Sequence, residues 1–147
     1  MRLEGTRFGD IAIDGEKIIT IQEGLLGFPD SRRYVILDHS EDSPFKLFQS
    51  VDEPELTFII IDPMLFKADY RVQVACKKIP MLEPFEPDDL LIMSIVTIQE
   101  GSKEITANLQ GPLVINTRNR FAKQVVLVDT EYTTRHSIKS LFHPKKS

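Results

Sequence analysis

Cysteine and tryptophan are nearly missing from this chain of 147 residues, which has one cysteine and no tryptophan. A lone cysteine cannot form an internal disulfide, and this usage is typical of proteins that stay in a reducing cytosol. We expect Cys76 to be a small core residue rather than a reactive thiol. The composition therefore predicts a cytoplasmic protein that folds without disulfides.

Long apolar segments are also missing. The first ten residues, Met1 to Asp10, are polar and lack the apolar region of a signal peptide. The longest apolar run, Leu90 to Ile98, has the length of a strand and falls far short of the roughly 20 residues that span a bilayer. We therefore expect no association with a membrane.

The residues that build most catalytic and metal sites are scarce. The three histidines, His39, His136 and His143, have no second histidine or cysteine at the spacing of metal ligands. The seven glycines are scattered and form no phosphate-binding loop, and no G-x-S-x-G nucleophile motif occurs. These absences favour a binding protein over an enzyme, and we expect no catalytic residue, cofactor or metal.

Positive charge is concentrated at the C-terminus. The formal net charge is −4, and residues 133–147 hold four basic residues and no acid, so that this tail carries +4 and residues 1–132 carry −8. An acidic body repels phosphates, which argues against direct nucleic-acid binding, and it would attract a basic protein partner. Acidic surfaces can also serve only for solvation, and charge alone leaves both interpretations open.

What the chain does contain is a series of short apolar runs with a period near two, separated by turn residues, a pattern typical of β-strands. We therefore predict an all-β fold, a single-domain small antiparallel β-barrel or sandwich over residues 1–132 with at most short helical turns. The predicted strands are Phe8–Ile13, Lys17–Ile21, Tyr34–Leu37, Phe45–Gln49, Leu56–Ile61, Tyr70–Cys76, Leu90–Ile98, Ile105–Leu109, Leu113–Asn116 and Gln124–Val128.

Three local features add detail to this prediction. Asp14-Gly15 is a tight-turn signal and predicts a hairpin that joins the first two runs. Met64 to Asp69 is expected to form one helical turn. Residues 133–147 are expected to be a basic, flexible tail in which Pro144 ends any helix, while the apolar residues of this tail leave a docking role open.

Several segments, taken in order, carry a resemblance to a known family. They include a Gly-x-x-Gly-Phe arrangement and an acidic loop between two strand-like runs. The segments are Ile21–Phe28, Phe48–Pro54, Phe58–Pro63, Ile95–Ile98, Thr106–Asn116, and Gln124–Leu127 with Tyr132. In this order they resemble the FliW family of flagellar assembly factors, and the likeness extends over roughly residues 1–135.

The resemblance implies a flagellar assembly factor with two protein partners. It implies chaperone-like binding of flagellin in the cytoplasm. It also implies binding of the RNA-binding translational regulator CsrA, which would antagonise the repression of flagellin mRNA translation. An acidic body agrees with a basic partner of this kind. We expect a monomer when the protein is free, and no direct contact with nucleic acid.

We expect the partner contacts on an acidic loop and on the irregular segment after the next strand. A charged loop beside apolar residues would supply a steering rim and a buried anchor. The residues predicted to contact a partner are Asp52, Glu53, Glu55, Asp62, Leu65, Phe66 and Tyr70. An equally good interpretation is that Leu65 and Phe66 simply close one end of a barrel.

Other residues in the family-like segments are predicted to shape the fold. Gly24 and Gly27 would supply backbone conformations that other residues resist. Asn108 and Asn116 lie at strand ends, where side-chain amides can bind loose backbone groups.

Two other classes of function stay open from the sequence. A small β-barrel that binds a ligand, or acts as an enzyme, would need a cavity lined with convergent polar groups. A direct RNA-binding module would need a basic face.

Overall fold

The computed structural model describes residues 2–6, 9–38, 43–70, 86–98, 101, 104–128 and 130–138. Their regular structure consists of short strands and three single-turn 3-10 helices, η1 (Gly15–Lys17), η2 (Pro63–Leu65) and η3 (Pro87–Asp89). The all-β prediction is therefore confirmed. The strand predicted at Tyr70–Cys76 lies outside the described residues except for Tyr70, and so does the lone cysteine.

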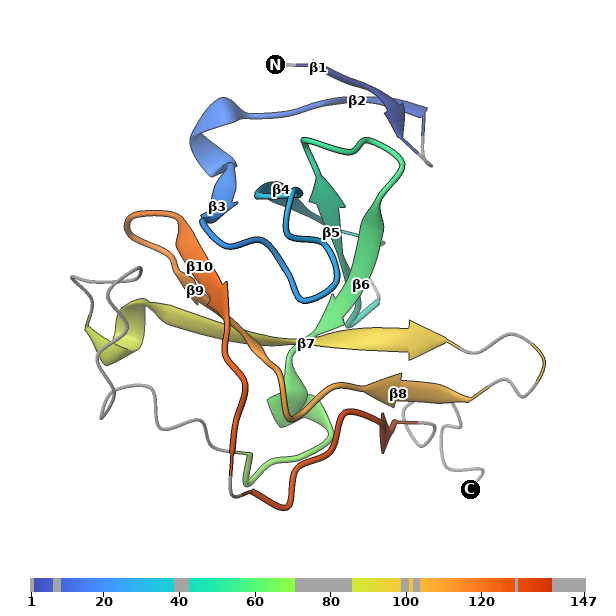
Figure 1. Ribbon diagram of the computed structural model, residues 1–147, viewed down its shortest axis with the longest axis vertical. Coiled ribbons are helices and arrows are strands. Elements are labelled where there is room, and N and C mark those ends of the chain that lie inside the picture. The colour runs from blue at the N-terminus through green and yellow to red at the C-terminus, as the bar shows by residue number, and fades with distance from the viewer. Residues whose placement is uncertain are drawn as a thin grey trace.

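Seven strands close into a barrel (Figure 1). They are β3 (Ile19–Ile21), β4 (Arg33–Asp38), β5 (Lys46–Ser50), β6 (Thr57–Ile61), β7 (Leu90–Ile98), β9 (Leu113–Asn116) and β10 (Phe121–Gln124). Around the barrel the order is β7, β6, β5, β4, β3, β10 and β9, and β9 pairs back to β7. The pairing of β3 with β10 is parallel, and the other six are antiparallel. The predicted antiparallel barrel thus contains one parallel junction.

The longest strand, β7, belongs to two parts of the molecule. Its first half, Leu90 to Met93, pairs with β9 and closes the barrel. Its second half pairs with β6 on one side and with β8 (Ile105–Ala107) on the other. Strand β11 (His136–Ser137) pairs in turn with β8, so the end of β7 carries a flap of two strands beyond the barrel (Figure 1).

The barrel interior is filled by one side of each strand, because alternate residues of a strand point to opposite faces. Tyr34 and Phe48 are fully buried there, with ring centroids 4.4 Å apart and nearly parallel planes. The other buried members of this core are Ile19, Ile21, Leu25, Ile60, Met93, Leu113, Ile115 and Ala122. These residues come from all seven barrel strands and one loop, so the core depends on closure of the barrel.

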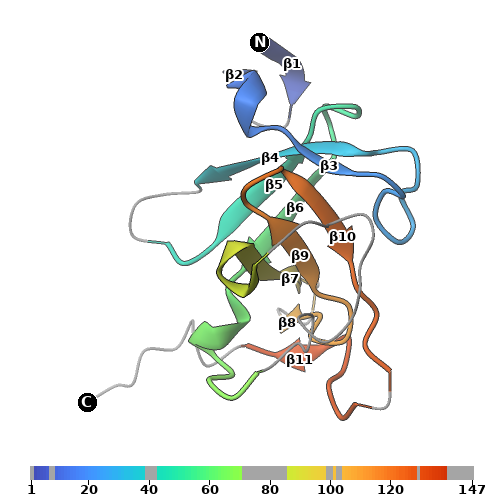
Figure 2. The same cartoon turned by 90° about the vertical axis from the view of Figure 1, so that its left-hand side faces the viewer.

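The predicted hairpin at Asp14-Gly15 is wrong. The Asp14 carboxylate accepts a hydrogen bond from Glu16 N at 3.0 Å and starts helix η1, so the chain turns through a helical turn instead of a tight two-residue loop. A different hairpin forms nearer the N-terminus, between β1 (Arg2–Thr6) and β2 (Gly9–Ala12). This hairpin packs over one end of the barrel through Leu3 and its neighbours (Figure 2).

The last predicted run, Gln124–Val128, is shifted relative to the structure. Strand β10 occupies Phe121 to Gln124, and the chain continues as an extended segment to Val128. This segment lies along Gln110–Pro112, because Val125 N donates to Pro112 O at 2.9 Å and Leu127 N donates to Gln110 O at 2.8 Å.

The beginning of the basic tail is ordered. His136 and Ser137 form β11, and Ile138 is fully buried, with its N–H donating to Ile105 O at 3.0 Å. The prediction of a flexible tail did not anticipate this short strand. Residues 139–147 lie outside the described residues, and the division of the chain at residue 132 stays a prediction.

The connection from β3 to β4 folds back on itself at Gly24. This residue has φ of +69°, and a Cβ atom added to it would lie 2.6 Å from Phe28 O and 2.7 Å from Pro29 Cα. The close approach lets Leu25 enter the core and sets the ring of Phe28 edge-on to Phe58, with centroids 5.2 Å apart. The structure thus supports a fold-shaping role for Gly24.

We predict that Gly24→Ala lowers the free energy of unfolding by more than about 2 kcal/mol, because it combines backbone strain with a collision against backbone atoms. Gly101→Ala is the matched control: Gly101 also has positive φ, +93°, but nothing lies within 4 Å of its added Cβ. Urea denaturation of both variants measures the difference. Equal losses would contradict the importance of the close approach.

Candidate partner-binding surfaces

The acidic loop between β5 and β6 is held in place by the buried amide of Gln49. The Gln49 Nε2 donates to the carbonyl oxygens of Pro54 at 2.7 Å and of Ser50 at 2.9 Å. Its Oε1 accepts a hydrogen bond from Thr57 Oγ1 at 2.6 Å. The loop residues Val51–Leu56 therefore fold around a fixed side chain and present their acidic groups in one arrangement.

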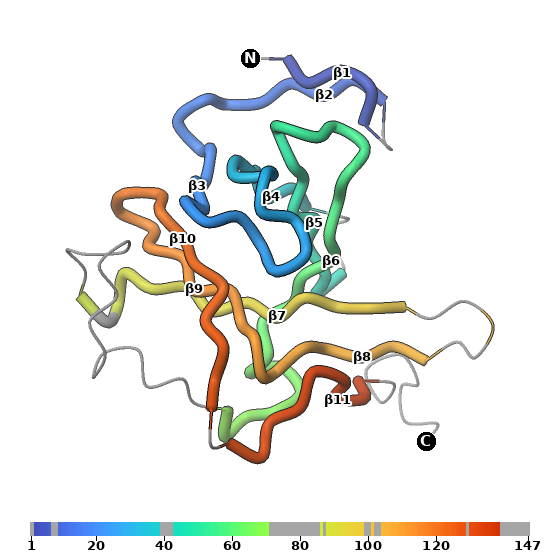
Figure 3. The backbone as a smooth tube through the Cα atoms, in the orientation of Figure 1, coloured from blue at the N-terminus to red at the C-terminus, as the bar shows by residue number. Residues whose placement is uncertain are grey.

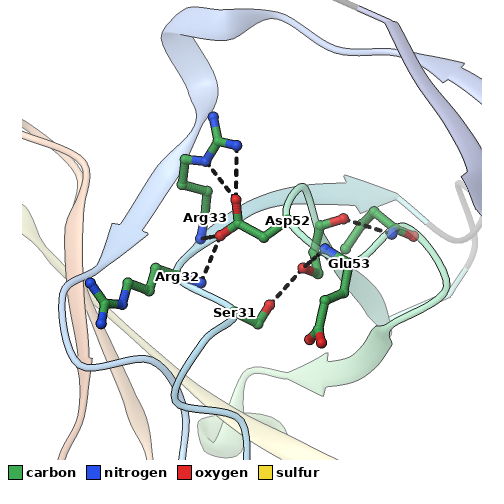
Figure 4. Close-up of polar contacts among 7 residues, drawn as sticks. Ser31, Arg32, Arg33, Asp52 and Glu53 are labelled. Carbon is green, nitrogen blue, oxygen red and sulfur yellow. Dashed lines mark hydrogen bonds and ion pairs between the residues drawn. The ribbon is translucent and has the colours of Figure 1, made fainter.

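The Asp52 carboxylate points toward the start of β4 and binds Arg32 and Arg33 there (Figure 4). Its Oδ2 accepts hydrogen bonds from the backbone N–H groups of Arg32 at 2.9 Å and Arg33 at 3.0 Å. Its Oδ1 accepts a hydrogen bond from Arg33 Nε at 2.8 Å and forms an ion pair with Arg33 Nη2, also at 2.8 Å. All of this bonding is internal, so Asp52 joins two connections of the barrel.

The environment of Asp52 lowers the pKa of its carboxyl group. Desolvation raises this pKa, but the hydrogen bonds from the backbone of Arg32 and from the side chain and backbone of Arg33 outweigh that effect. A carboxyl group with a lowered pKa in the folded state stabilises the fold above its ordinary value of 3.8. That contribution is lost as the pH falls through the lowered pKa.

Glu53 and Glu55 lie in the same loop but are exposed. The backbone N–H of Glu53 donates to Ser50 Oγ at 2.9 Å, and Ser50 Oγ lies 2.6 Å from Ser31 Oγ (Figure 4). This fixes the backbone of the loop while its two glutamate side chains face solvent. These two carboxylates are exposed members of the predicted acidic rim.

The irregular segment after β6 forms an apolar tip, Asp62–Phe66. The Asp62 carboxylate accepts a hydrogen bond from Met64 N at 2.9 Å and so starts helix η2. One helical turn was predicted over Met64–Asp69, and of these residues only Met64 and Leu65 belong to η2. Met64 and Leu65 are exposed, at 44% and 54% of their full surface. Phe66 is half-buried and stacks on His136 of β11, with ring centroids 5.6 Å apart.

Tyr70 is buried, with 3% of its surface exposed. Its hydroxyl donates to Leu109 O at 2.6 Å, and its ring centroid lies 4.7 Å from that of Tyr132. Burial raises the pKa of Tyr70 well above its usual value. The structure therefore uses Tyr70 for internal packing, and the residue does not line an exposed surface.

The structure does not bring the seven predicted contact residues together. Asp52, Glu53 and Glu55 precede β6, whereas the apolar tip and Tyr70 follow it (Figure 1). The five residues of β6 separate the two groups by roughly 17 Å along the strand. The acidic loop and the apolar tip are therefore two surfaces at opposite ends of the barrel.

The described residues offer little for a cofactor. No group of three or more histidine, cysteine, aspartate or glutamate residues among them could hold a metal ion. Within the same part of the chain, no helix is long and apolar enough to cross a membrane. A wide, open groove lies over Asp52 and is lined by Thr20, Asp30, Arg32 and Arg33. One of its two cations, Arg33, is already paired with Asp52.

Comparison with known proteins decides the family. The model of the family described as FliW protein matches residues 2–138. The chain belongs to the FliW family. The flagellar assembly factor FliW of Treponema denticola is 40% identical over 138 residues, covering 94% of this chain and 93% of that protein. The FliW of Magnetococcus marinus is 42% identical over 130 residues, covering 88% and 80%.

A solved structure shows the same fold. The crystal structure of a flagellar assembly factor FliW superposes with a TM-score of 0.82 at 33% sequence identity, and covers 93% of this chain and 96% of that chain. The chain of this FliW-family protein is thus matched over almost its whole length in both sequence and fold. The family resemblance expected from the ordered segments is confirmed.

Two asparagines in the family-like segments of this FliW-family protein bind backbone groups and so stabilise the fold. Asn108 Oδ1 accepts a hydrogen bond from Gly111 N at 2.8 Å, and Asn116 Oδ1 accepts one from Arg118 N at 2.9 Å. Both amides end strands as predicted. The sequence analysis missed Gln49 and Arg33, which hold the acidic loop. A glutamine within an apolar strand run is a usable signal, because a buried amide needs backbone partners.

We predict that Asp52→Asn lowers the free energy of unfolding near neutral pH by about 1–3 kcal/mol, because the amide cannot replace the charged acceptor of four contacts. The difference from the wild type should begin to shrink as the pH falls below 3.8, where the carboxyl group of the unfolded chain becomes protonated, and it should disappear once the pH has fallen through the lowered pKa of the folded state. Urea denaturation at several pH values measures both effects.

Asp38→Asn is the control for this prediction, because Asp38 forms an exposed ion pair with Lys46 at 2.6 Å. We expect only a small change in stability from this variant. A loss as large as that of Asp52→Asn, or a pH-independent loss in Asp52→Asn, would contradict the role assigned to the Asp52 carboxylate.

Proposed function

We propose that this FliW-family protein acts in the cytoplasm by binding two proteins, flagellin and the translational regulator CsrA. It holds flagellin in a chaperone-like way, and it antagonises the repression of flagellin mRNA translation by CsrA. Accumulated flagellin occupies the protein and releases CsrA, which closes a feedback loop. The observation that carries this proposal is the match to the FliW family over residues 2–138.

The acidic loop supports a basic partner such as CsrA. Glu53 and Glu55 are exposed on a backbone that Gln49 and Asp52 hold rigid. Exposed charges at the rim of an interface speed association with a partner of opposite sign. A loop that is already ordered also loses little conformational freedom on binding. The acidic loop is therefore our proposed contact for CsrA.

The apolar tip is the second proposed contact surface. Leu65 and Met64 present apolar side chains, while Asp62 and Phe66 fix the turn from which they project. Because the tip and the acidic loop lie at opposite ends of β6, one partner covering both would have to span the barrel.

The proposed function rests on binding and assigns no catalytic residue or cofactor. Direct RNA binding is disfavoured by the acidic balance of residues 1–132 and by the pairing of Arg33 with Asp52. We propose that the free protein is a monomer.

Size-exclusion chromatography with light scattering tests the proposal. The protein is mixed with flagellin, with CsrA, and with both. We expect two binary complexes, and displacement of CsrA when flagellin is added. Failure of both partners to co-elute at micromolar concentration would overturn the proposal.

We predict that the double variant Glu53→Ser/Glu55→Ser binds CsrA on the order of 3–10-fold more weakly at low salt, with a flatter salt dependence, because two steering charges are lost. Asp52 is left intact because its removal would disturb the loop. The matched control is Glu86→Ser/Glu131→Ser, which removes two exposed carboxylates elsewhere. Isothermal titration calorimetry at several salt concentrations measures both. An equal loss of CsrA affinity in the control variant would show that only net charge matters, and it would contradict a specific role for the acidic loop.

A further inference from the structure

Among the described residues, the segment that follows β10 is paired on one side only. Strand β3 pairs with β10 only at Thr20 and Ile21, opposite Phe121 and Ala122. Beyond that point the β3 chain turns away into the Gly24 loop, while the other chain continues extended to Val128 (Figure 3). The side of Gln124–Val128 that faces β3 therefore has no strand next to it among the described residues.

Within the described part of the chain, the backbone of this segment is unpaired on the side that faces β3. Val125 N and Leu127 N donate to Pro112 O and Gln110 O, so the odd-numbered residues point their backbone groups toward the Gln110–Pro112 side. In an extended strand the intervening residue points its N–H and C=O the opposite way. Within the described part of the chain, the backbone of Val126 has no hydrogen-bond partner. Such an unpaired edge is a template for another strand.

Apolar side chains flank the same edge. Val126 and Val128 lie two residues apart on one face of the strand and are 50% and 67% exposed. Leu26, in the Gly24 loop, is 65% exposed. The loop is tied to the segment by Gln124, whose Oε1 accepts a hydrogen bond from Leu26 N at 3.0 Å and whose Nε2 donates to Gly111 O at 3.0 Å.

A small depression completes the surface. It has a volume of about 70 Å³, and it is lined by Ile21, Glu23, Gly24, Leu26, Lys123 and Gln124. The two charged groups are paired, with Lys123 Nζ 3.4 Å from Glu23 Oε1. The depression thus has no net charge, and it has room for one small apolar side chain beside an extended backbone.

We propose that this edge groove, formed by Gln124–Val128, Leu26 and the depression, binds an extended apolar segment of flagellin as an added β-strand. The backbone groups of Val126 favour an extended peptide, since the backbone N–H and C=O groups of a helix are already hydrogen-bonded to each other. The exposed valines select apolar side chains at alternate positions of that peptide. The five residues of the edge match a bound segment of roughly 16 Å.

The assignment to flagellin rests on the proposed function. Of its two proposed partners, the basic regulator is drawn to carboxylates, and the only carboxylate lining the depression is neutralised by Lys123. The edge groove is also separate from the acidic loop and the apolar tip. The two partners therefore contact different residues of the barrel.

A synthetic peptide tests the groove without flagellin. The probe is acetyl-Thr-Val-Thr-Val-Thr-amide, added at millimolar concentration to the ¹⁵N-labelled full chain. We expect shifts of the backbone amide signals of Leu26, Gln124 and Val126, and loss of these shifts when alternate peptide nitrogens of the probe are methylated. Methylation removes the donors of an added strand and leaves its apolar surface. Absent shifts, or shifts that persist with the methylated probe, overturn strand addition.

Variants test the partner. Val126→Asp should weaken flagellin binding at least tenfold and leave CsrA binding unchanged, whereas Val126→Thr should bind flagellin nearly normally. Ile98→Asp is the matched control, because Ile98 is 51% exposed on another strand. Equal flagellin affinity of Val126→Asp and wild type overturns the assignment to flagellin. If the wild type binds no flagellin at all, the proposed function fails, and the peptide result still decides whether the edge groove accepts a strand.

Discussion

The double pairing of β7 is the constraint on which the rest of this structure depends. Leu90 to Met93 pair with β9 and Ser94 to Val96 pair with β6, so one continuous strand joins β6 to β9 and closes the barrel. Closure removes two open sheet edges that would otherwise attract other chains. It also creates the enclosed interior in which Tyr34 and Phe48 stack. The same strand then continues outward and supports β8 and β11.

Once the barrel is closed, hydrogen-bonded polar side chains position its loops. Gln49 organises the acidic loop, Asp52 ties that loop to the start of β4, and Gln124 ties the Gly24 loop to β10. Each of these groups binds backbone atoms of a segment that has no regular secondary structure. Loops held in this way present side chains without a large ordering cost, which suits a protein that works by contact.

The surfaces proposed for partners lie on different parts of the barrel. The acidic loop is at the end covered by the β1–β2 hairpin, and the apolar tip is at the end near β11 (Figure 2). The edge groove lies where β3 stops short of β10. A charged rim, an apolar tip and a backbone edge that is unpaired among the described residues suit different kinds of partner. The proposed exchange of CsrA for flagellin would therefore use separate contacts, with competition arising through overlap of the bound partners.

Much of the fold was predictable because strand alternation is a local property. The runs that became β4, β5, β6, β7 and β9 were placed to within one residue at either end, since each is a short run rich in apolar and β-branched residues between clear turn signals. The family was likewise readable from ordered segments. The partner-contact residues were harder to predict. Asp52 and Tyr70 are polar residues that could have bound a partner, but in the structure they form hydrogen bonds within the protein.

The sequence by itself determined the class of fold, the positions of most strands, the acidic balance and the family. Only the tertiary structure decided that β3 pairs in parallel with β10, that β1 pairs with β2 in place of the hairpin predicted at Asp14, and that the predicted contact residues divide between two ends of β6. The physical reason is the separation along the chain over which each interaction acts. Alternation and turn chemistry act over a few residues, whereas strand partners, and the polar groups buried between them, are selected by contacts between residues far apart in the chain.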